Sequence, residues 1–348
     1  MKGARLHGKE TIRYEDVPEP VCQERDVVIE VKWAGLCGSD VKCYINGGAA
    51  RGMELPRVLG HEVVGVIAEC GSGVEGFRLG EPVVAAAIVP CGTCYYCQRG
   101  LHNLCGSKQT LGYSYDGVFA ERMRVPAASV QLGGLLKVPN GLPLEHAVLA
   151  EPLSCVLNGQ RLSHVGIGDA VVIFGGGPIG LLHAQLAKRT GAGPIILCEV
   201  SSSRLAAASC LPCVDMAIDA ARPDLVETIL SATDGRGADV VITAAPAPEA
   251  QVSALLVAAP RARVNFFGGL PSSRRVVPLD SNLIHYRELM VHGSADSSFS
   301  ELADALKLLV RGEVVADMIV TDRCSLADIE TAITRSRQAD GLKAILCP

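Results

Sequence analysis

A strand, a glycine turn and a helix follow one another directly near the middle of the chain. Residues 170–174 form a continuous apolar run that predicts a buried strand, and residues 179–190 have the character of a helix. Between them stands the run Gly175-Gly176-Gly177-Pro178-Ile179-Gly180. Glycines cluster in many turns, so the pattern G-x-G-x-x-G is weak alone, but here it has the flanking strand and helix that the motif requires. The feature predicts a βαβ unit.

This turn also predicts a ligand. A helix N-terminus offers backbone N–H groups and a positive dipole end, which suit a pyrophosphate. Glu199 ends the next predicted strand, where a carboxylate accepts hydrogen bonds from a ribose 2′-hydroxyl and repels a 2′-phosphate, which favours NAD over NADP. Arg204 slightly weakens that preference, and an ordinary strand end is the alternative for Glu199. The predicted cofactor-binding residues are Gly175, Gly177, Pro178, Ile179, Gly180, Glu199, Arg204 and Gly268.

Four cysteines lie within one short stretch, with two residues between each of the first three and seven before the last: Cys91, Cys94, Cys97 and Cys105. Four thiolates can close a tetrahedral zinc site that leaves no open position, so its role is structural. Disulfides are the alternative, which such close spacing disfavours. His102 lies inside the stretch and is expected to be a bystander, since four cysteines already complete the coordination shell.

A second set of potential ligands comes from separate places in the chain. Cys37 opens Cys37-Gly38-Ser39-Asp40, His61 and Glu62 lie in Gly60-His61-Glu62, and Glu151 precedes Pro152. Thiolate, imidazole and carboxylate together suit Zn²⁺, and a catalytic zinc keeps one position for water or substrate. Taken singly, each residue has an ordinary explanation in burial or exposure.

Composition excludes several classes of function. A formal charge of −5 without basic clusters argues against a nucleic-acid partner. No apolar run reaches transmembrane length and the first residues lack the apolar core of a signal peptide, so no membrane association is expected. Fourteen cysteines in such a chain indicate metal ligands and buried thiols. We therefore expect a cytoplasmic protein.

The pattern of apolar residues divides the 348-residue chain. Residues 1–150 contain short strands, among them 27–31 and 63–68, between frequent glycines and prolines, which suggests a small barrel. After residue 151, strands alternate with helices, which implies a parallel sheet covered on both faces. Near Val291 the pattern changes again. The further elements expected are strands at 195–199, 240–242, 263–267 and 344–346, and helices at 225–232, 299–311 and 326–337.

Together, these motifs resemble the zinc-dependent medium-chain dehydrogenases and, within them, the polyol group of sorbitol (L-iditol), threonine and galactitol-phosphate dehydrogenases. The resemblance covers essentially the whole length. It implies a GroES-like β-barrel catalytic domain at 1–150, a Rossmann NAD-binding domain at 151–292, and a return to the catalytic domain at 293–348. It also implies a homodimer or homotetramer.

The resemblance implies roles for single residues. Cys37, His61 and Glu62 would ligate a catalytic zinc, and Glu151 would ligate it directly or hold its water. Ser39 would take the proton of the substrate hydroxyl. Lys42 stands where many relatives carry the histidine that ends the proton relay, so its role stays open between a relay group, an anion-binding cation, which Arg51 and Arg57 would reinforce, and a solvated lysine.

The predicted function is an oxidoreductase that passes a hydride between NAD and a secondary alcohol of a polyhydroxylated small molecule, a polyol, sugar alcohol or cyclitol. Dehydrogenation of a 3-hydroxy amino acid or of a phosphorylated sugar alcohol is the alternative. A zinc-free reductase of quinones or enones is disfavoured, because it would not need Cys37, His61 and Glu62 together. A zinc module for nucleic acid is disfavoured because the glycine turn would have no purpose.

Overall fold

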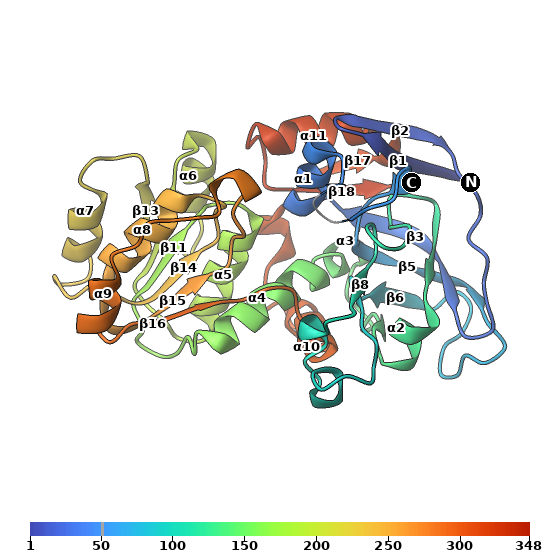
Figure 1. The fold of residues 1–348 in the computed structure, drawn as a ribbon, viewed down its shortest axis with the longest axis horizontal. Helices are drawn as coiled ribbons and strands as arrows, with labels where there is room; N and C mark the ends of the chain where they lie inside the picture. The colour runs from blue at the N-terminus through green and yellow to red at the C-terminus, as the bar shows by residue number, and fades with distance from the viewer. Residues whose placement is uncertain (50–51) are drawn as a thin grey trace. The chain divides into compact units, whose positions relative to one another are not determined.

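The computed structural model describes residues 1–49 and 52–348, so Arg51 lies outside the described residues. The chain forms two compact units, shown as ribbons in Figure 1. The first unit comprises Met1–Ser154, Ser297–Gly312 and Val320–Pro348, and the second comprises Cys155–Asp296 and Glu313–Ile319.

The first unit is built around a mixed sheet in the order β10-β6-β5-β3-β18-β17, with β9 also pairing with β3. A three-stranded sheet, β2-β1-β4, and a two-stranded sheet, β7-β8, accompany it. The strands are β1 (Lys2–Gly8), β2 (Thr11–Asp16), β3 (Val27–Gly35), β4 (Arg57–Val58), β5 (Glu62–Cys70), β6 (Pro82–Ala85), β7 (Ile88–Val89), β8 (Gln109–Thr110), β9 (Arg122–Val125), β10 (Leu135–Lys137), β17 (Val320–Ser325) and β18 (Lys343–Cys347). The helices are α1 (Gly38–Asn46), α2 (Ala127–Gln131), α3 (Leu144–Ala147), α10 (Phe299–Val310) and α11 (Ile329–Arg337).

Strands β3 and β5 form the centre of this sheet, and both contain strands that the sequence predicted. Their apolar side chains are buried in the core of the unit. Gly65 is required in β5, because a Cβ atom there would lie 2.3 Å from the carbonyl oxygen of Glu30 on β3. The pairing shifts register between Val31 and Trp33, opposite this glycine, so Gly65 lies at a bulge of the pair.

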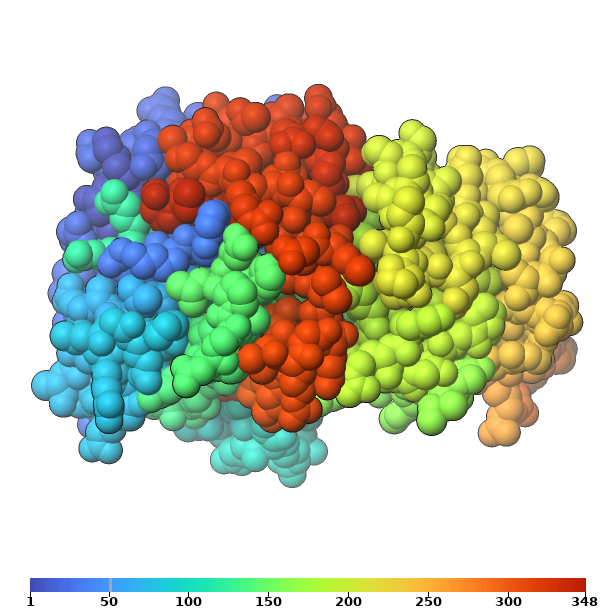
Figure 2. Space-filling view, turned by 180° about the vertical axis from the view of Figure 1, so that it is seen from behind, coloured from blue at the N-terminus to red at the C-terminus, as the bar shows by residue number. Residues whose placement is uncertain are grey.

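The C-terminal segment completes the same sheet. Strand β18 pairs antiparallel with the end of β3, and β17 lies beyond it in parallel register. The space-filling view shows this red segment beside the blue N-terminal one on the surface of the unit (Figure 2). The return to the first unit is interrupted, however. Residues 313–319 belong to the second unit, where the Gln185 side chain bonds to the backbone N–H of Val315 at 2.8 Å.

The second unit contains a six-stranded, all-parallel sheet in the order β13-β12-β11-β14-β15-β16. The order reverses at β11, and ligands of such sheets bind at the carboxyl ends of the strands at this switch point. The strands are β11 (Val171–Phe174), β12 (Ile195–Glu199), β13 (Met216–Asp219), β14 (Ala238–Thr243), β15 (Ala258–Phe266) and β16 (Met290–Gly293). The helices are α5 (Pro178–Arg189), α6 (Ser202–Ser209), α7 (Leu225–Ser231), α8 (Pro248–Leu256) and α9 (Ser281–Tyr286).

Two helices that bear on the sites were not predicted. Helix α1 starts directly after Cys37, and helix α4 (Ala150–Leu162) begins in the first unit and ends in the second. Pro152 in the first turn of α4 is compatible with a helix, because the N–H groups of that turn have no intrahelical partner. No helix among the described residues combines the length and apolar character needed to cross a membrane.

Candidate functional site

Three of the four predicted catalytic-metal ligands come together in the first unit. Cys37 is the N-cap of α1, whereas His61 and Glu62 lie where the chain enters β5. One ligand atom from each residue lies within 4.8 Å of the other two. These three residues are called the open set below. They converge because β3 and β5 are adjacent strands, with Gly35 paired to Glu62.

Asp40 holds the imidazole of the open set. Its carboxylate is fully buried and lies 3.2 Å from His61 Nδ1, while its other oxygen accepts a hydrogen bond from the Cys37 N–H. Burial alone would lower the pKa of His61, but the Asp40 charge outweighs it and the pKa is raised well above its usual value. The contact orients the ring so that Nε2 is left for a ligand. A carboxylate beside the other ring nitrogen is the usual support of a metal-binding histidine. Asp40 ends the motif Cys37-Gly38-Ser39-Asp40, but its support of the imidazole was not predicted.

Lys343 was missed entirely. It is the first residue of β18, is 4% exposed, and donates to Glu62 Oε1 at 2.6 Å and to the Leu36 carbonyl at 3.0 Å. Burial would lower the pKa of Lys343, yet Glu62 and then Cys37 raise it further than burial lowers it. Gly35 makes room for this pair, because a Cβ atom there would meet the Glu62 carboxylate at 2.0 Å. A lysine in an otherwise ordinary strand carried no signal in the sequence.

Glu151 stands apart from the open set. It lies in the first turn of α4, half-buried, and is not part of the three-residue group found among the described residues. Its charge still contributes to the raised pKa of Lys343. The structure thus places Glu62 within the group and Glu151 near it.

The two predicted proton-relay residues both lie on α1. Ser39 Oγ is 3.5 Å from His61 Nε2. Lys42 is exposed, one helical turn further on. Arg57 is on β4 and lines a different cavity, described below, whose described lining does not include Lys42. The sequence also missed Tyr113, a buried residue whose ring centroid lies 5.7 Å from that of His61.

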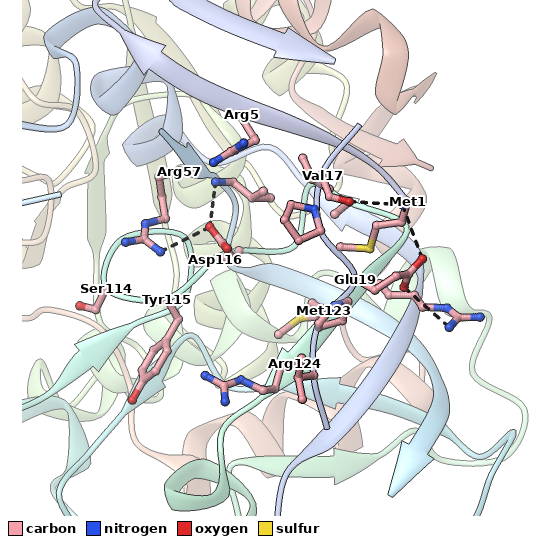
Figure 3. Close-up of a pocket in the computed structure, with 17 residues that line it drawn as sticks. Met1, Arg5, Val17, Glu19, Arg57, Ser114, Tyr115, Asp116, Met123 and Arg124 are labelled. Atoms are coloured by element: carbon pink, nitrogen blue, oxygen red, sulfur yellow. Dashed lines mark hydrogen bonds and ion pairs between the residues drawn. The ribbon is translucent and has the colours of Figure 1, made fainter. Parts of the chain in front are cut away.

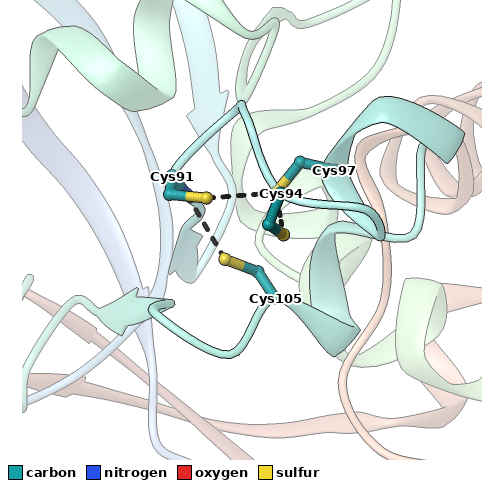
Figure 4. A group of neighbouring side chains, drawn as sticks. All are labelled: Cys91, Cys94, Cys97 and Cys105. Carbon is teal, nitrogen blue, oxygen red and sulfur yellow. Dashed lines mark hydrogen bonds between the residues drawn. The ribbon is translucent and has the colours of Figure 1, made fainter.

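The four predicted structural cysteines form a second group, called the cysteine cluster (Figure 4). Their sulfur atoms lie within 4.8 Å of one another, with Cys94 and Cys97 sulfurs 3.5 Å apart. None of them forms a disulfide. Hydrogen bonds from the backbone of Thr93 and Cys94 lower the pKa of Cys91 to about 6, whereas burial raises the pKa of Cys97 to about 12. His102 is outside the group and stacks on Phe299, with centroids 4.3 Å apart.

The glycine turn of the second unit has the geometry that phosphate binding needs. Gly175 follows β11 with a φ of 113°, which favours glycine, and a Cβ atom at Gly180 would lie only 1.8 Å from the Gly175 carbonyl oxygen. Gly177 is the N-cap of α5, and Pro178 occupies its first turn next to Ile179. The first N–H groups of this helix have no intrahelical partner and are available to a phosphate.

Glu199 reaches back from the end of β12 to this turn. Its carboxylate is 8% exposed and accepts hydrogen bonds from the N–H groups of Gly176 (2.6 Å), Val200 (2.7 Å) and Ser201 (2.8 Å). Arg204 is also close, because a Cβ atom at Gly177 would lie 3.4 Å from its guanidinium.

Gly268 lies beyond β15 at the same edge of the sheet, and its N–H donates to the Thr243 carbonyl at 2.6 Å. A Cβ atom at Gly268 would lie 2.7 Å from the Ala245 carbonyl oxygen. The second unit therefore brings the predicted cofactor residues to one edge.

The donor atoms fit the groups that the sequence implied. The sulfur, nitrogen and carboxylate oxygen of the open set, within 4.8 Å of one another, match a zinc site with one vacant coordination position. The four sulfurs of the cysteine cluster match a zinc site whose coordination is complete. The glycine turn, the free helix end and Glu199 match a dinucleotide.

Comparison with known families agrees with this geometry. A family described as the alcohol dehydrogenase GroES-like domain matches residues 23–139, and one described as zinc-binding dehydrogenase matches residues 178–311. The L-threonine 3-dehydrogenase of Pyrococcus abyssi is 35% identical over 326 residues, 93% of this chain and 90% of that protein. The sorbitol dehydrogenase of Bacillus subtilis is 33% identical over 340 residues, 97% of this chain and 94% of that protein.

Solved structures share the whole fold. A putative zinc-binding dehydrogenase from Sinorhizobium meliloti, bound to NADP, superposes with a TM-score of 0.91 and 30% identity, covering 100% of this chain and 99% of that one. An alcohol dehydrogenase from E. coli, complexed with NADH, gives a TM-score of 0.90 and 28% identity, with coverage of 100% and 99%.

Proposed function

The chain belongs to the zinc-dependent medium-chain alcohol dehydrogenases, and we propose that it oxidises a secondary alcohol of a polyol, sugar alcohol or cyclitol to a ketone while reducing NAD. The observation that carries the proposal is the convergence of Cys37, His61 and Glu62 within 4.8 Å. The related threonine and sorbitol dehydrogenases support the same reaction at a CH–OH group.

The open set would hold the catalytic zinc, and Glu151 is proposed to hold a water or substrate hydroxyl bound beside it. Bound there, zinc supplies Lewis acidity toward the alcohol oxygen. Ser39, 3.5 Å from His61 Nε2, takes the hydroxyl proton and passes it toward the surface, where Lys42 is one candidate for the end of the relay. The C–H hydride goes to the nicotinamide, so each turnover yields one ketone, one NADH and one released proton.

Asp40 and Lys343 prepare these groups without touching the substrate. Asp40 orients His61 through the charge of its carboxylate, and Lys343 offsets the charge of Glu62, which would otherwise be buried beside a thiolate. The cysteine cluster would hold a second, structural zinc, for a total of two metal ions per chain. Elemental analysis of the fully loaded protein tests that number, and a content near one would contradict it.

The cofactor is proposed to be NAD rather than NADP, because the Glu199 carboxylate stands where a 2′-phosphate would add like charge. Arg204 and the NADP-bound relative work against this preference. We expect kcat/KM to favour NAD, and Glu199→Ala to narrow the gap by roughly tenfold or more, since charge-assisted hydrogen bonds to the ribose are lost.

Glu288→Ala, an exposed carboxylate of the same unit, is the matched control and should leave the ratio unchanged. Equal kcat/KM for NAD and NADP in the unaltered enzyme would contradict the cofactor preference inferred from Glu199.

Substrate class is tested by an NAD-coupled screen of sugar alcohols, cyclitols, phosphorylated sugar alcohols and 3-hydroxy amino acids. Activity confined to threonine-like compounds would replace the polyol assignment. Lys42→Met belongs in the same screen over a range of pH. Loss limited to phosphorylated substrates would identify Lys42 as an anion-binding group, and a displaced pH optimum with every substrate would identify it as the end of the relay. No change in either would leave it a solvated side chain.

The proposed assembly is a homodimer or homotetramer in the cytoplasm. Strand β16 is an edge of the second unit's sheet, and apolar side chains on it and at the end of the preceding helix α9 are exposed: Tyr286 (80%) and Met290 (53%). Unpaired strand edges with apolar neighbours are suited to association. The double variant Tyr286→Asp with Met290→Lys should yield monomers in analytical ultracentrifugation.

The cytoplasmic location is proposed because a reducing compartment suits thiolate metal sites and fourteen free cysteines.

A further inference from the structure

A cavity of about 440 Å³ lies in the first unit, beside the strands β1 and β4 (Figure 3). This volume falls in the range of pockets that hold small molecules. Its described lining includes four arginines, Arg5, Arg57, Arg122 and Arg124, and none of the residues of the open set or of the cysteine cluster. The cavity is therefore not the site described above.

Arg57 has a buried donor that no acceptor satisfies among the described residues. Its side chain is only 16% exposed, and its Nε atom is buried without a hydrogen-bond acceptor among the described residues. Its carboxylate neighbour is Asp116, at a long 3.4 Å, and that side chain is 67% exposed. A guanidinium carries five N–H donors, and burying them without acceptors is costly. Arg57 thus has donors available to an incoming oxyanion.

Arg5 adds a second loosely held guanidinium. It donates to the Pro56 carbonyl at 3.5 Å and lies 3.7 Å from Glu15, a carboxylate that His7 approaches more closely, at 2.8 Å. In Figure 3, Arg5 and Arg57 lie on the same side of the cavity, near Asp116. Arg124, by contrast, is tied at 3.1 Å to the buried Asp26 and serves the structure.

The rest of the wall is apolar in part. Pro18, Pro20 and Val21 line the cavity with apolar side chains that are exposed or half-buried and can contact the body of an organic molecule. We propose that this cavity binds a small organic anion, with Arg57 and Arg5 bonding its phosphate or carboxylate group and the apolar wall receiving its carbon skeleton. Bidentate recognition of either oxyanion is a property of the guanidinium group.

The cavity is connected to the catalytic region by one loop. Ser114, Tyr115 and Asp116 line the cavity, while Tyr113, directly before them, contacts the ring of His61. The Gly117 N–H donates to the Val58 carbonyl at 2.8 Å, which ties the loop to β4.

Binding is tested by calorimetry on the zinc-loaded enzyme saturated with NAD, so that the glycine turn is filled and no turnover is required. The probes are inorganic phosphate, propyl phosphate and succinate at low, constant ionic strength, none of which carries an alcohol that the enzyme could oxidise. We expect Arg57→Gln to weaken binding roughly tenfold or more. Asp116→Asn removes a competing charge and should tighten binding roughly two- to fivefold, the worth of an exposed ion pair.

Arg261→Gln, an exposed arginine of the second unit, is the matched control and should bind as the unaltered protein does. The relative affinity of the phosphates and succinate then identifies which oxyanion the cavity prefers. Failure of all three probes to bind below about 10 mM, or equal binding by Arg57→Gln, would overturn the proposal. If Arg57→Gln does not fold, an unchanged affinity in Asp116→Asn would overturn it. Because no step of the assay depends on alcohol oxidation, its failure would leave the proposed dehydrogenase reaction standing.

Discussion

The open set and the cysteine cluster occupy the same unit, but they are built in opposite ways. The cysteine cluster comes from one stretch, residues 91–105, and its ligand atoms are four sulfurs. The open set comes from a helix start and a strand start, and it depends on Asp40 and on Lys343, which is 281 residues from Glu62 in sequence. A local loop is enough to shape a closed, structural site. A site that must keep a ligand position open needs neighbouring charges to be balanced by distant parts of the fold.

Replacing Cys37 tests the open set most strongly. We expect Cys37→Ser to lower kcat/KM by roughly a thousandfold or more, because Lewis acidity worth several kcal/mol is lost and each 1.36 kcal/mol is a factor of ten. The thermal midpoint should remain near that of the unaltered protein. Steady-state kinetics and metal analysis measure both effects. Cys210→Ser, at an exposed cysteine of the second unit, is the control. Retention of a tenth of the activity would contradict the assigned role.

Removing Lys343 tests the charge balance of the open set. In metal-free protein, Lys343→Met should lower the free energy of unfolding by about 3–5 kcal/mol, the cost of leaving one charge of a buried pair uncompensated. Zinc adds positive charge beside Glu62, so the loss should be much smaller in the loaded protein. Denaturant unfolding with and without zinc measures the difference. Lys307→Met, which breaks an exposed pair with Asp304, is the control. An equal loss of unfolding free energy in metal-free and zinc-loaded protein would contradict the proposal that Lys343 balances the charge of Glu62.

Replacing Cys97 tests the cysteine cluster in the opposite sense. Cys97→Ser should lower the thermal midpoint by roughly 5 °C, because the metal-dependent closure of the loop is lost, and it should weaken the assembly. Activity per folded chain should change little. Calorimetry, together with kinetics below the transition, separates the two effects. A variant with an unaltered midpoint but abolished turnover would reverse the roles of the two groups.

Thiol chemistry distinguishes the cysteines within the cluster. In metal-stripped protein at pH 7, Cys91 should react with iodoacetamide before Cys97, because Cys91 is exposed and its pKa of about 6 makes it mostly thiolate, whereas the pKa of Cys97 is about 12. Below pH 6 the Cys91 thiolate is protonated, so its rate should fall about tenfold per pH unit. Mass spectrometry of the labelled peptides measures both rates. Zinc should protect both cysteines, and faster labelling of Cys97 would contradict the predicted order.

Much of the second unit could be predicted from sequence because its signals are local. The predicted strand at 195–199 coincides with β12, and the helix predicted from residue 179 is α5. The conformation of the glycine turn is set by its own residues, since a side chain at Gly180 would collide with the backbone of Gly175. The cysteine spacing is equally local. Helix α4 was not predicted because Pro152 disfavours a helix everywhere except in its first turn, where the structure places it.

The sequence by itself determined which residues could bind metal and nucleotide, since those residue types and spacings have few other uses. Only the tertiary structure decided how the open set is balanced. The pairing of β18 with β3 brings Lys343 to Glu62, and the cap of α1 brings Asp40 to His61. Such contacts depend on strand register and on burial, which set the strength of a charge pair and are properties of the folded chain rather than of any local sequence.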